Sequence, residues 1–114
     1  MALDELELKR IDRTVGSLCR KLSPPEHAEK LRTVYEVQGH TVTMYEDRPP
    51  WDGVGEWTHR GLARFRYVRS SGLWGLYWMR ADLRWHRYDP APSTADLASL
   101  VAVVADDEYG AFLG

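Results

Sequence analysis

The sequence predicts an α+β fold, in which about five mostly antiparallel strands form one sheet and an N-terminal and a C-terminal helix pack on one of its faces. Apolar residues recur every three or four positions near both ends of the chain, as they do on one side of a helix. The middle of the chain instead holds short β-branched and aromatic runs separated by turn residues, as in hairpins. At 114 residues, the chain fits a single domain over residues 1–114.

The N-terminal helix is expected over residues 3–22. Its apolar positions are three, four, three and four residues apart, which places them on one stripe: Leu8, Ile11, Val15, Leu18 and Leu22. Because the stripe lasts only about two heptads, we expect it to pack on a sheet rather than in a coiled coil, which needs at least about three. Cys19 lies beside the stripe and is interpreted as a small buried side chain.

A short helix and a hairpin are expected next. Ser23 followed by Glu26 is a capping box, so a short helix starts there and ends near residue 30. Residues 32–38 and 41–46 are rich in β-branched and aromatic side chains, and the glycine between them suits a two-residue turn.

A loop and a three-stranded meander follow. Residues 47–58 contain two prolines and two glycines, too many for regular structure. A second hairpin is predicted to join residues 62–69 to residues 73–80. A tight turn at Ala81 and Asp82 then leads into a strand over residues 83–88.

The C-terminal helix is expected to begin after Ser93, with Ser93 as its cap and Asp96 at the third position. It should stop by Ala105, because the acidic residues that follow are unfavourable at the negative end of the helix dipole. Its apolar stripe comprises Leu97, Leu100, Val101 and Val104.

Charge is distributed unevenly although the formal net charge is only −2. Residues 58–88 carry seven basic side chains and one acidic one, a formal charge of +6, against −3 before this segment and −5 after it. A local basic field attracts polyanions even on a mildly acidic protein. Alternatively, the acidic ends fold over the basic centre and neutralise it.

Side-chain alternation predicts that Arg64 and Arg66 share one face of the meander while Phe65 and Tyr67 point to the helices. Which rows of the next strands join the arginines depends on the register. The guanidinium groups of arginines suit a sugar-phosphate backbone, and aromatic rings suit stacking with bases. The candidate nucleic-acid-binding residues are Arg64, Arg66, Arg84 and His86 for phosphates, and Trp51 and Trp74 for bases.

Structural roles compete with each of these assignments. A strand arginine is usually solvated with its stem over apolar neighbours, and tryptophan in a small domain is usually in the core. Because these residues cluster, we retain the hypothesis of nucleic-acid binding, although a protein partner with an acidic patch would also suit the same surface. The loop from Arg48 to Trp57 is a second candidate surface, because its tryptophans can anchor a protein partner.

No catalytic or metal-binding motif is present in the sequence. The four histidines fall on different predicted elements without metal-ligand spacing, so we expect no metal site and no cofactor. His86, beside Arg84, Arg87 and Tyr88, is the one candidate for metal-independent RNA cleavage. The mixture of Arg, His and Tyr on a small sheet also resembles bacterial toxin ribonucleases, by analogy of architecture alone.

Several segments carry a family resemblance: RPPW at 48–51, EW at 56–57, ARFRYV at 63–68, LYWMRADLRWHRYDP at 76–90 and GAFLG at 110–114. They resemble the small bacterial proteins grouped as the domain of unknown function 3024 family, over nearly the whole chain from Ile11. The resemblance implies a small stand-alone bacterial domain and transfers no functional residue.

Taken together, the sequence favours a noncatalytic protein that binds RNA or single-stranded DNA. A protein-interaction module that uses the loop from Arg48 to Trp57 is the first alternative, and a metal-independent ribonuclease is the second. A single cysteine and a charged, polar start predict a cytoplasmic protein without a disulfide, a leader or a membrane span.

Overall fold

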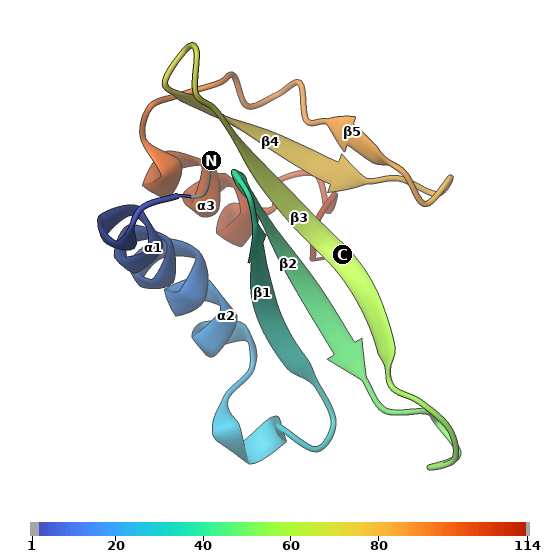
Figure 1. The fold of residues 1–114 in the computed structure, drawn as a ribbon. Helices are drawn as coiled ribbons and strands as arrows, with labels where there is room; N and C mark the ends of the chain where they lie inside the picture. Colours follow the sequence, from blue (N-terminus) through green and yellow to red (C-terminus); the bar gives the residue numbers. More distant parts are fainter. Residues whose placement is uncertain (1–2, 114) are drawn as a thin grey trace.

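The structure, a computed structural model, describes residues 3–113; Gly114, which closes the C-terminal segment quoted above, lies outside them. Five strands form one antiparallel sheet in sequence order (Figure 1). Their bounds are β1 Arg32–Gln38, β2 Thr41–Arg48, β3 Thr58–Val68, β4 Leu73–Met79 and β5 Trp85–Arg87. The predicted α+β class is confirmed.

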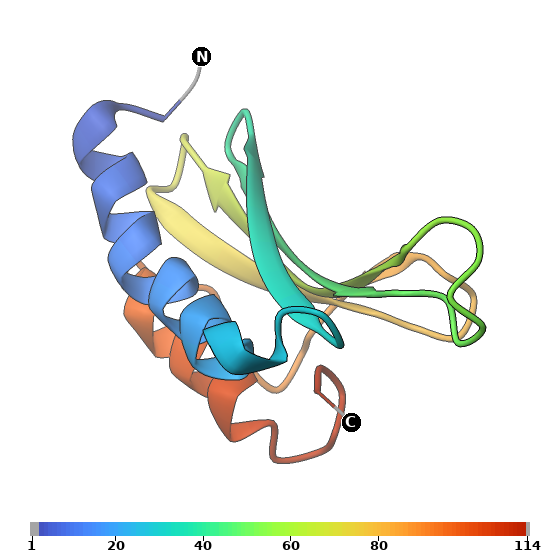
Figure 2. The same cartoon turned by 90° about the horizontal axis from the view of Figure 1, so that it is seen from below.

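Both long helical segments lie on the same face of the sheet (Figure 2). The first comprises α1 Glu5–Ile11, the π-helical stretch Asp12–Gly16 and α2 Ser17–Leu22, and the second is α3 Leu97–Asp106. The sequence predicted one regular N-terminal helix and gave no sign of the π-helical stretch. The short helix predicted after Ser23 is a single 3₁₀ turn, Pro25–His27.

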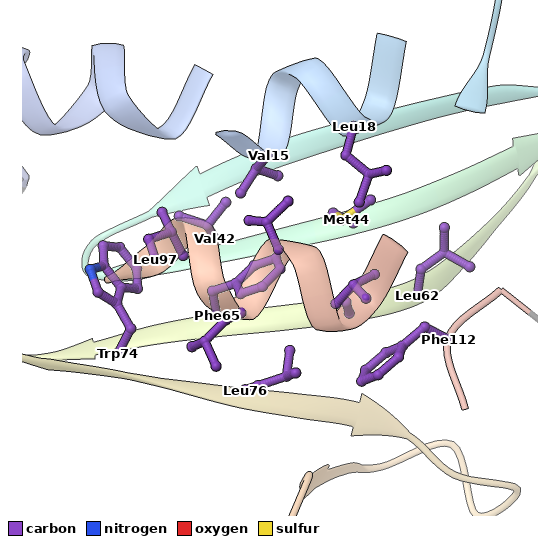
Figure 3. Packing of buried hydrophobic residues seen from close by; sticks show 14 of the residues in the cluster. Val15, Leu18, Val42, Met44, Leu62, Phe65, Trp74, Leu76, Leu97 and Phe112 are labelled. Carbon is purple, nitrogen blue, oxygen red and sulfur yellow. The ribbon is translucent and has the colours of Figure 1, made fainter. Parts of the chain in front are cut away.

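The core lies between this helical layer and one face of the sheet (Figure 3). Phe65 on β3 pairs with Val42 on β2 and with Leu76 on β4, and all three side chains are completely buried. Burying a side chain of this size stabilises the fold by about 1.5–3 kcal/mol. The buried row therefore fixes which side of β3 faces the helices.

Asp12 in the π-helical stretch joins the helical layer to the edge strand β1. Its Oδ1 accepts a hydrogen bond of 2.9 Å from the Tyr35 hydroxyl and one of 3.2 Å from Arg20. The bonds from Arg20 and Tyr35 lower the pKa of the Asp12 carboxyl. Gly16 leaves room for this carboxylate, because an added Cβ would lie 2.7 Å from Oδ1.

The last helix begins later than predicted. Asp96, not Ser93, caps it by accepting a hydrogen bond from the Ala98 amide. The physical reason is a short bridge to the sheet: Thr94 and Trp74 exchange both backbone hydrogen bonds, which keeps the chain extended up to Thr94.

The final strand is also shorter than predicted, because the turn before it is wider. Leu83 has a φ of 62° and Asp82 accepts a hydrogen bond from the Arg84 amide, so the turn continues to residue 84. In contrast, β3 begins at Thr58, four residues earlier than expected, and the preceding loop shrinks to residues 49–57.

Past α3, Asp107 holds the end of the chain against the core. It adopts the left-handed conformation, with a φ of 45°, and its carboxylate accepts hydrogen bonds from the Phe112 and Leu113 amides. Phe112 is buried against Tyr88, 4.8 Å away between ring centroids. The predicted end of the helix by Ala105 is one residue short.

Cys19 should be chemically inert in the folded protein. The side chain is buried, and burial raises the pKa of its thiol to about 11. At pH 8, about one thiol in a thousand is then ionised, against about a quarter for a free thiol with a pKa near 8.5. We expect no reaction with a disulfide reagent until denaturant is added; rapid labelling of the native protein would contradict the burial of Cys19.

Candidate nucleic-acid interface

The face of the sheet that points away from the helices carries a row of basic and aromatic side chains. In register, Thr43 on β2 pairs with Arg64 on β3, Arg64 with Tyr77 on β4, and Tyr77 with Arg87 on β5. No part of the described chain covers this face (Figure 2). We call it the outer face.

Arg66 extends the basic row along β3. It lies two residues beyond Arg64, on the same face, and pairs with Gly75 on β4. The absence of a side chain at Gly75 leaves space into which the Arg87 guanidinium extends, since a Cβ there would lie 3.2 Å from its Nη1. The Arg87 guanidinium therefore occupies the gap over the residue that pairs with Arg66.

Arg64 is held by two contacts with neighbouring side chains. Its Nε donates a hydrogen bond of 3.0 Å to Oγ1 of Thr43, a side chain that is only 4% exposed. Its guanidinium carbon lies 4.6 Å from the centroid of the Trp85 ring, a cation–π contact. The guanidinium of Arg87 contacts the Tyr77 ring more loosely, at 5.8 Å.

Trp85 owes its position to a glycine in β3. A Cβ added to Gly61 would lie 2.6 Å from Cζ2 and 2.9 Å from Cη2 of Trp85. The indole therefore reaches across the end of β4 and packs directly on the backbone of β3, as glycine in a strand often permits. Gly61 thereby supports the contact between Trp85 and Arg64.

The arginines of the outer face are not neutralised by carboxylates. Among residues 3–113, the five salt bridges are Arg10–Glu7, Arg20–Asp12, Arg48–Glu46, His59–Asp47 and His86–Asp82. None of them links an arginine of residues 58–88 to an acidic residue near either end. Within the described chain, the alternative in which acidic ends pair with the basic centre is therefore not realised.

Comparison with known families identifies the chain. Residues 3–114 match the family described as a domain of unknown function, DUF3024. The chain belongs to this family. The predicted resemblance is thereby confirmed over essentially the whole length. Comparison with curated proteins and with solved structures gave no match.

Two of the predicted site residues of this DUF3024 domain lie on the helix side of the sheet. Trp74 is 3% exposed and packs against Tyr67 and the start of α3, so the stacking role predicted for it is wrong. Its row, with Leu76, faces the helices. His86 pairs with Trp78 in the register and therefore lies on the helix side of β5, not beside Arg64.

His86 forms a pair of its own. Its Nε2 lies 2.8 Å from Oδ2 of Asp82, and this contact is the main reason why the pKa of the Asp82 carboxyl is lowered. Arg84, exposed in the same turn, donates its backbone amide to Asp82. Sequence reasoning placed Arg84 and His86 with Arg64 because it put a tryptophan-bearing row, and not His86, beneath the helices.

Trp51 has the most exposed ring of the described tryptophans, at 97%. It lies in the loop between β2 and β3, which projects beyond the helical layer (Figure 2). Val54 in the same loop is 75% exposed, whereas Trp57 lies under the guanidinium of Arg32 at 4.4 Å. The loop thus presents one free indole and one free valine.

Sequence reasoning missed four residues of the outer face: Thr43, Tyr77, Trp85 and Arg87. The available signal was the pair of strand glycines, Gly61 and Gly75, since glycine inside a strand often marks the close approach of another group. Each of them lies next to a side chain from β5.

Two other classes of site find no support in the described structure. Between residues 3 and 113, no three side chains of His, Cys, Asp or Glu are grouped so as to hold a metal ion. No described helix has the length and apolar character that crossing a membrane requires.

Gly61→Ala tests the support of Trp85. The added methyl group forces the indole away from the strand, and overpacking of this kind costs about 1–3 kcal/mol in the free energy of unfolding. Denaturant unfolding and near-ultraviolet circular dichroism should both show the change. Gly75→Ala is the matched control, with a smaller loss, because the added Cβ would lie 3.2 Å from its nearest neighbour, Nη1 of Arg87, against 2.6 Å from Trp85 at Gly61. Equal losses would contradict this packing.

Proposed function

We propose that this protein is a noncatalytic binder of RNA or single-stranded DNA, and that its outer face holds the sugar-phosphate backbone. The single observation that carries the proposal is a row of three arginines, Arg64, Arg66 and Arg87, without carboxylate partners among the described residues. Phosphates are well suited to arginine, because the planar guanidinium can donate two parallel hydrogen bonds to two phosphate oxygens.

Aromatic rings on the same face favour a single strand over a duplex. Tyr77 and Trp85 lie between and beside the arginines, and both are half-buried. Unstacked bases can pack on such rings, whereas paired bases are already stacked on one another. A bound single-stranded nucleic acid can extend toward the loop between β2 and β3, where Trp51 provides a further aromatic ring.

The proposal is noncatalytic because His86, the one candidate base for RNA cleavage, lies on the opposite face of the sheet from Arg64 and Arg66, which hold the backbone in this proposal. His86 instead lines a hollow with Arg80, Arg87 and Tyr88. A bacterial, cytoplasmic setting belongs to the same proposal. The free and buried Cys19 is compatible with a reducing compartment.

The first test is binding of a labelled single-stranded RNA over a salt series, with the double variant Arg64→Glu/Arg66→Glu alongside. The native protein should bind with an affinity that falls steeply as salt rises, because each phosphate neutralised releases counterions. The variant should lose most of this binding and most of the salt dependence.

The matched control for charge is Arg13→Glu/Lys21→Glu, which makes the same change in net charge on the exposed side of the helical layer. This control should bind nearly as the native protein does. Duplex DNA of equal length should bind more weakly than the single strand. Binding that is absent at low salt, or equally weakened in both double variants, would refute the proposal.

A second candidate function rests on the loop from Arg48 to Trp57. The 97% exposure of Trp51 and the 75% exposure of Val54 leave a large apolar surface in water without a partner. Exposed tryptophan is the side chain that most often anchors a protein interface. On this alternative, the protein is an interaction module.

Trp51→Ala distinguishes this alternative. Because the indole touches little of its own chain, the substitution should leave the thermal midpoint unchanged while it abolishes capture of a protein partner from extract. Leu83→Ala is the control, since Leu83 is also exposed, at 80%, but lies in the turn between β4 and β5. Partner capture that survives in the Trp51 variant would exclude the loop as the anchor.

A further inference from the structure

We propose that Arg64, Thr43 and Trp85 form a preorganised phosphate subsite, in which Arg64 grips two oxygens of one phosphate and the other two residues position its guanidinium. This inference rests on the proposed function and adds which arginine recognises the phosphate, and by what geometry. It assigns Thr43 and Trp85 as positioning residues, a role that their sequence context did not indicate.

Thr43 fixes one edge of the guanidinium. Its Oγ1 accepts the hydrogen bond from Nε of Arg64 at 3.0 Å, and the two residues pair directly in the register of β2 and β3. Thr43 is 4% exposed and sits mid-strand, so its hydroxyl has little freedom to move. One of the five N–H groups of Arg64 is thereby occupied and the direction of the rest is set.

Trp85 supports the guanidinium from a different side. The Arg64 guanidinium carbon lies 4.6 Å from the ring centroid, and the indole is itself seated on Gly61. Together with the bond to Thr43, this contact restricts the rotation of the side chain about its terminal bonds. Arg64 thus loses less conformational entropy on binding than a mobile surface arginine would.

The remaining edge of Arg64 is suited to a ligand. Its Nη1 and Nη2 make no hydrogen bond to any residue between 3 and 113, and no carboxylate in that range pairs with it. Two parallel N–H donors match two oxygens of one phosphate. The further positive charges of Arg66 and Arg87 favour a chain of phosphates over a single carboxylate.

Arg66 provides a matched comparison on the same strand. It faces the same way as Arg64 and carries the same charge, but within the described chain its guanidinium makes no side-chain hydrogen bond and stacks on no ring. If charge alone attracts the nucleic acid, lysine should replace either arginine equally well. If the geometry of the guanidinium matters at one of the two positions, the two lysine substitutions should differ in their effect on binding.

The experiment compares Arg64→Lys, Arg66→Lys and Thr43→Val, by binding of a single-stranded oligoribonucleotide at one salt concentration. Loss of a bond between charged groups weakens binding about tenfold or more, so Arg64→Lys should show at least that loss. Arg66→Lys should change the affinity by no more than about twofold to threefold. Thr43→Val, which keeps the shape and suits a strand, should weaken binding although residue 43 is buried.

A second readout follows the Arg64 side chain directly, by ¹⁵N nuclear magnetic resonance of its Nε–H during titration with inorganic phosphate and with the oligoribonucleotide. We expect a shift of the Arg64 signal with both probes, and a smaller shift in Thr43→Val. Unchanged thermal midpoints in all three variants will show that the fold is retained.

The outcomes separate the subsite from the proposed function. If the oligonucleotide binds and both lysine variants match the native protein, the subsite is overturned while the proposed function stands. If the oligonucleotide fails to bind but phosphate shifts the Arg64 signal, the subsite stands as an anion site and the proposed function falls. If neither probe has an effect, both fall.

Discussion

Alternation of side chains along β3 is the constraint on which the rest of the molecule depends. Successive residues of a strand point to opposite faces, so burying Phe65 forces Arg64 and Arg66 to the other side. Pairing with β2 and β4 holds Phe65 in one row with Val42 and Leu76. A slip of one residue would expose Phe65 and bury two charges, which makes the alternative register prohibitively unfavourable. The core therefore determines where the arginines lie.

Three arginines on one face without salt-bridge partners among the described residues do not benefit the fold. Exposed like charges repel one another by up to about 1 kcal/mol at 4 Å in water, and more where water is partly excluded. Contacts of Arg64 with Trp85 and of Arg87 with Tyr77 offset some of this repulsion. Residues that work against local stability are typical of functional sites. This physical argument favours binding over a purely structural role for the outer face.

The strands of the central hairpins, the apolar stripes of both helices apart from the exposed Leu8, and the grouping of Arg64 with Arg66 could be predicted, because each follows from a local period. What could not be predicted depends on contacts distant in sequence. Asp96 caps α3 because Thr94 is bound to Trp74 on β4, and β5 starts late because Leu83 takes a positive φ. That late start follows a turn wider than the two residues predicted, and the register that places Trp85 and His86 depends on this turn.

The long motif over residues 76–90 can be divided by the same alternation. Leu76, Trp78 and Tyr88 belong to or pack against the core, and their presence in the motif is explained by the fold alone. Tyr77, Trp85 and Arg87 point to the other face, over which no helix is packed. Large aromatic side chains on an open face reduce solubility, and basic side chains close together there repel one another, without either adding to the core. The half of the motif that the core does not require is thus the half for which the proposed binding function offers a reason.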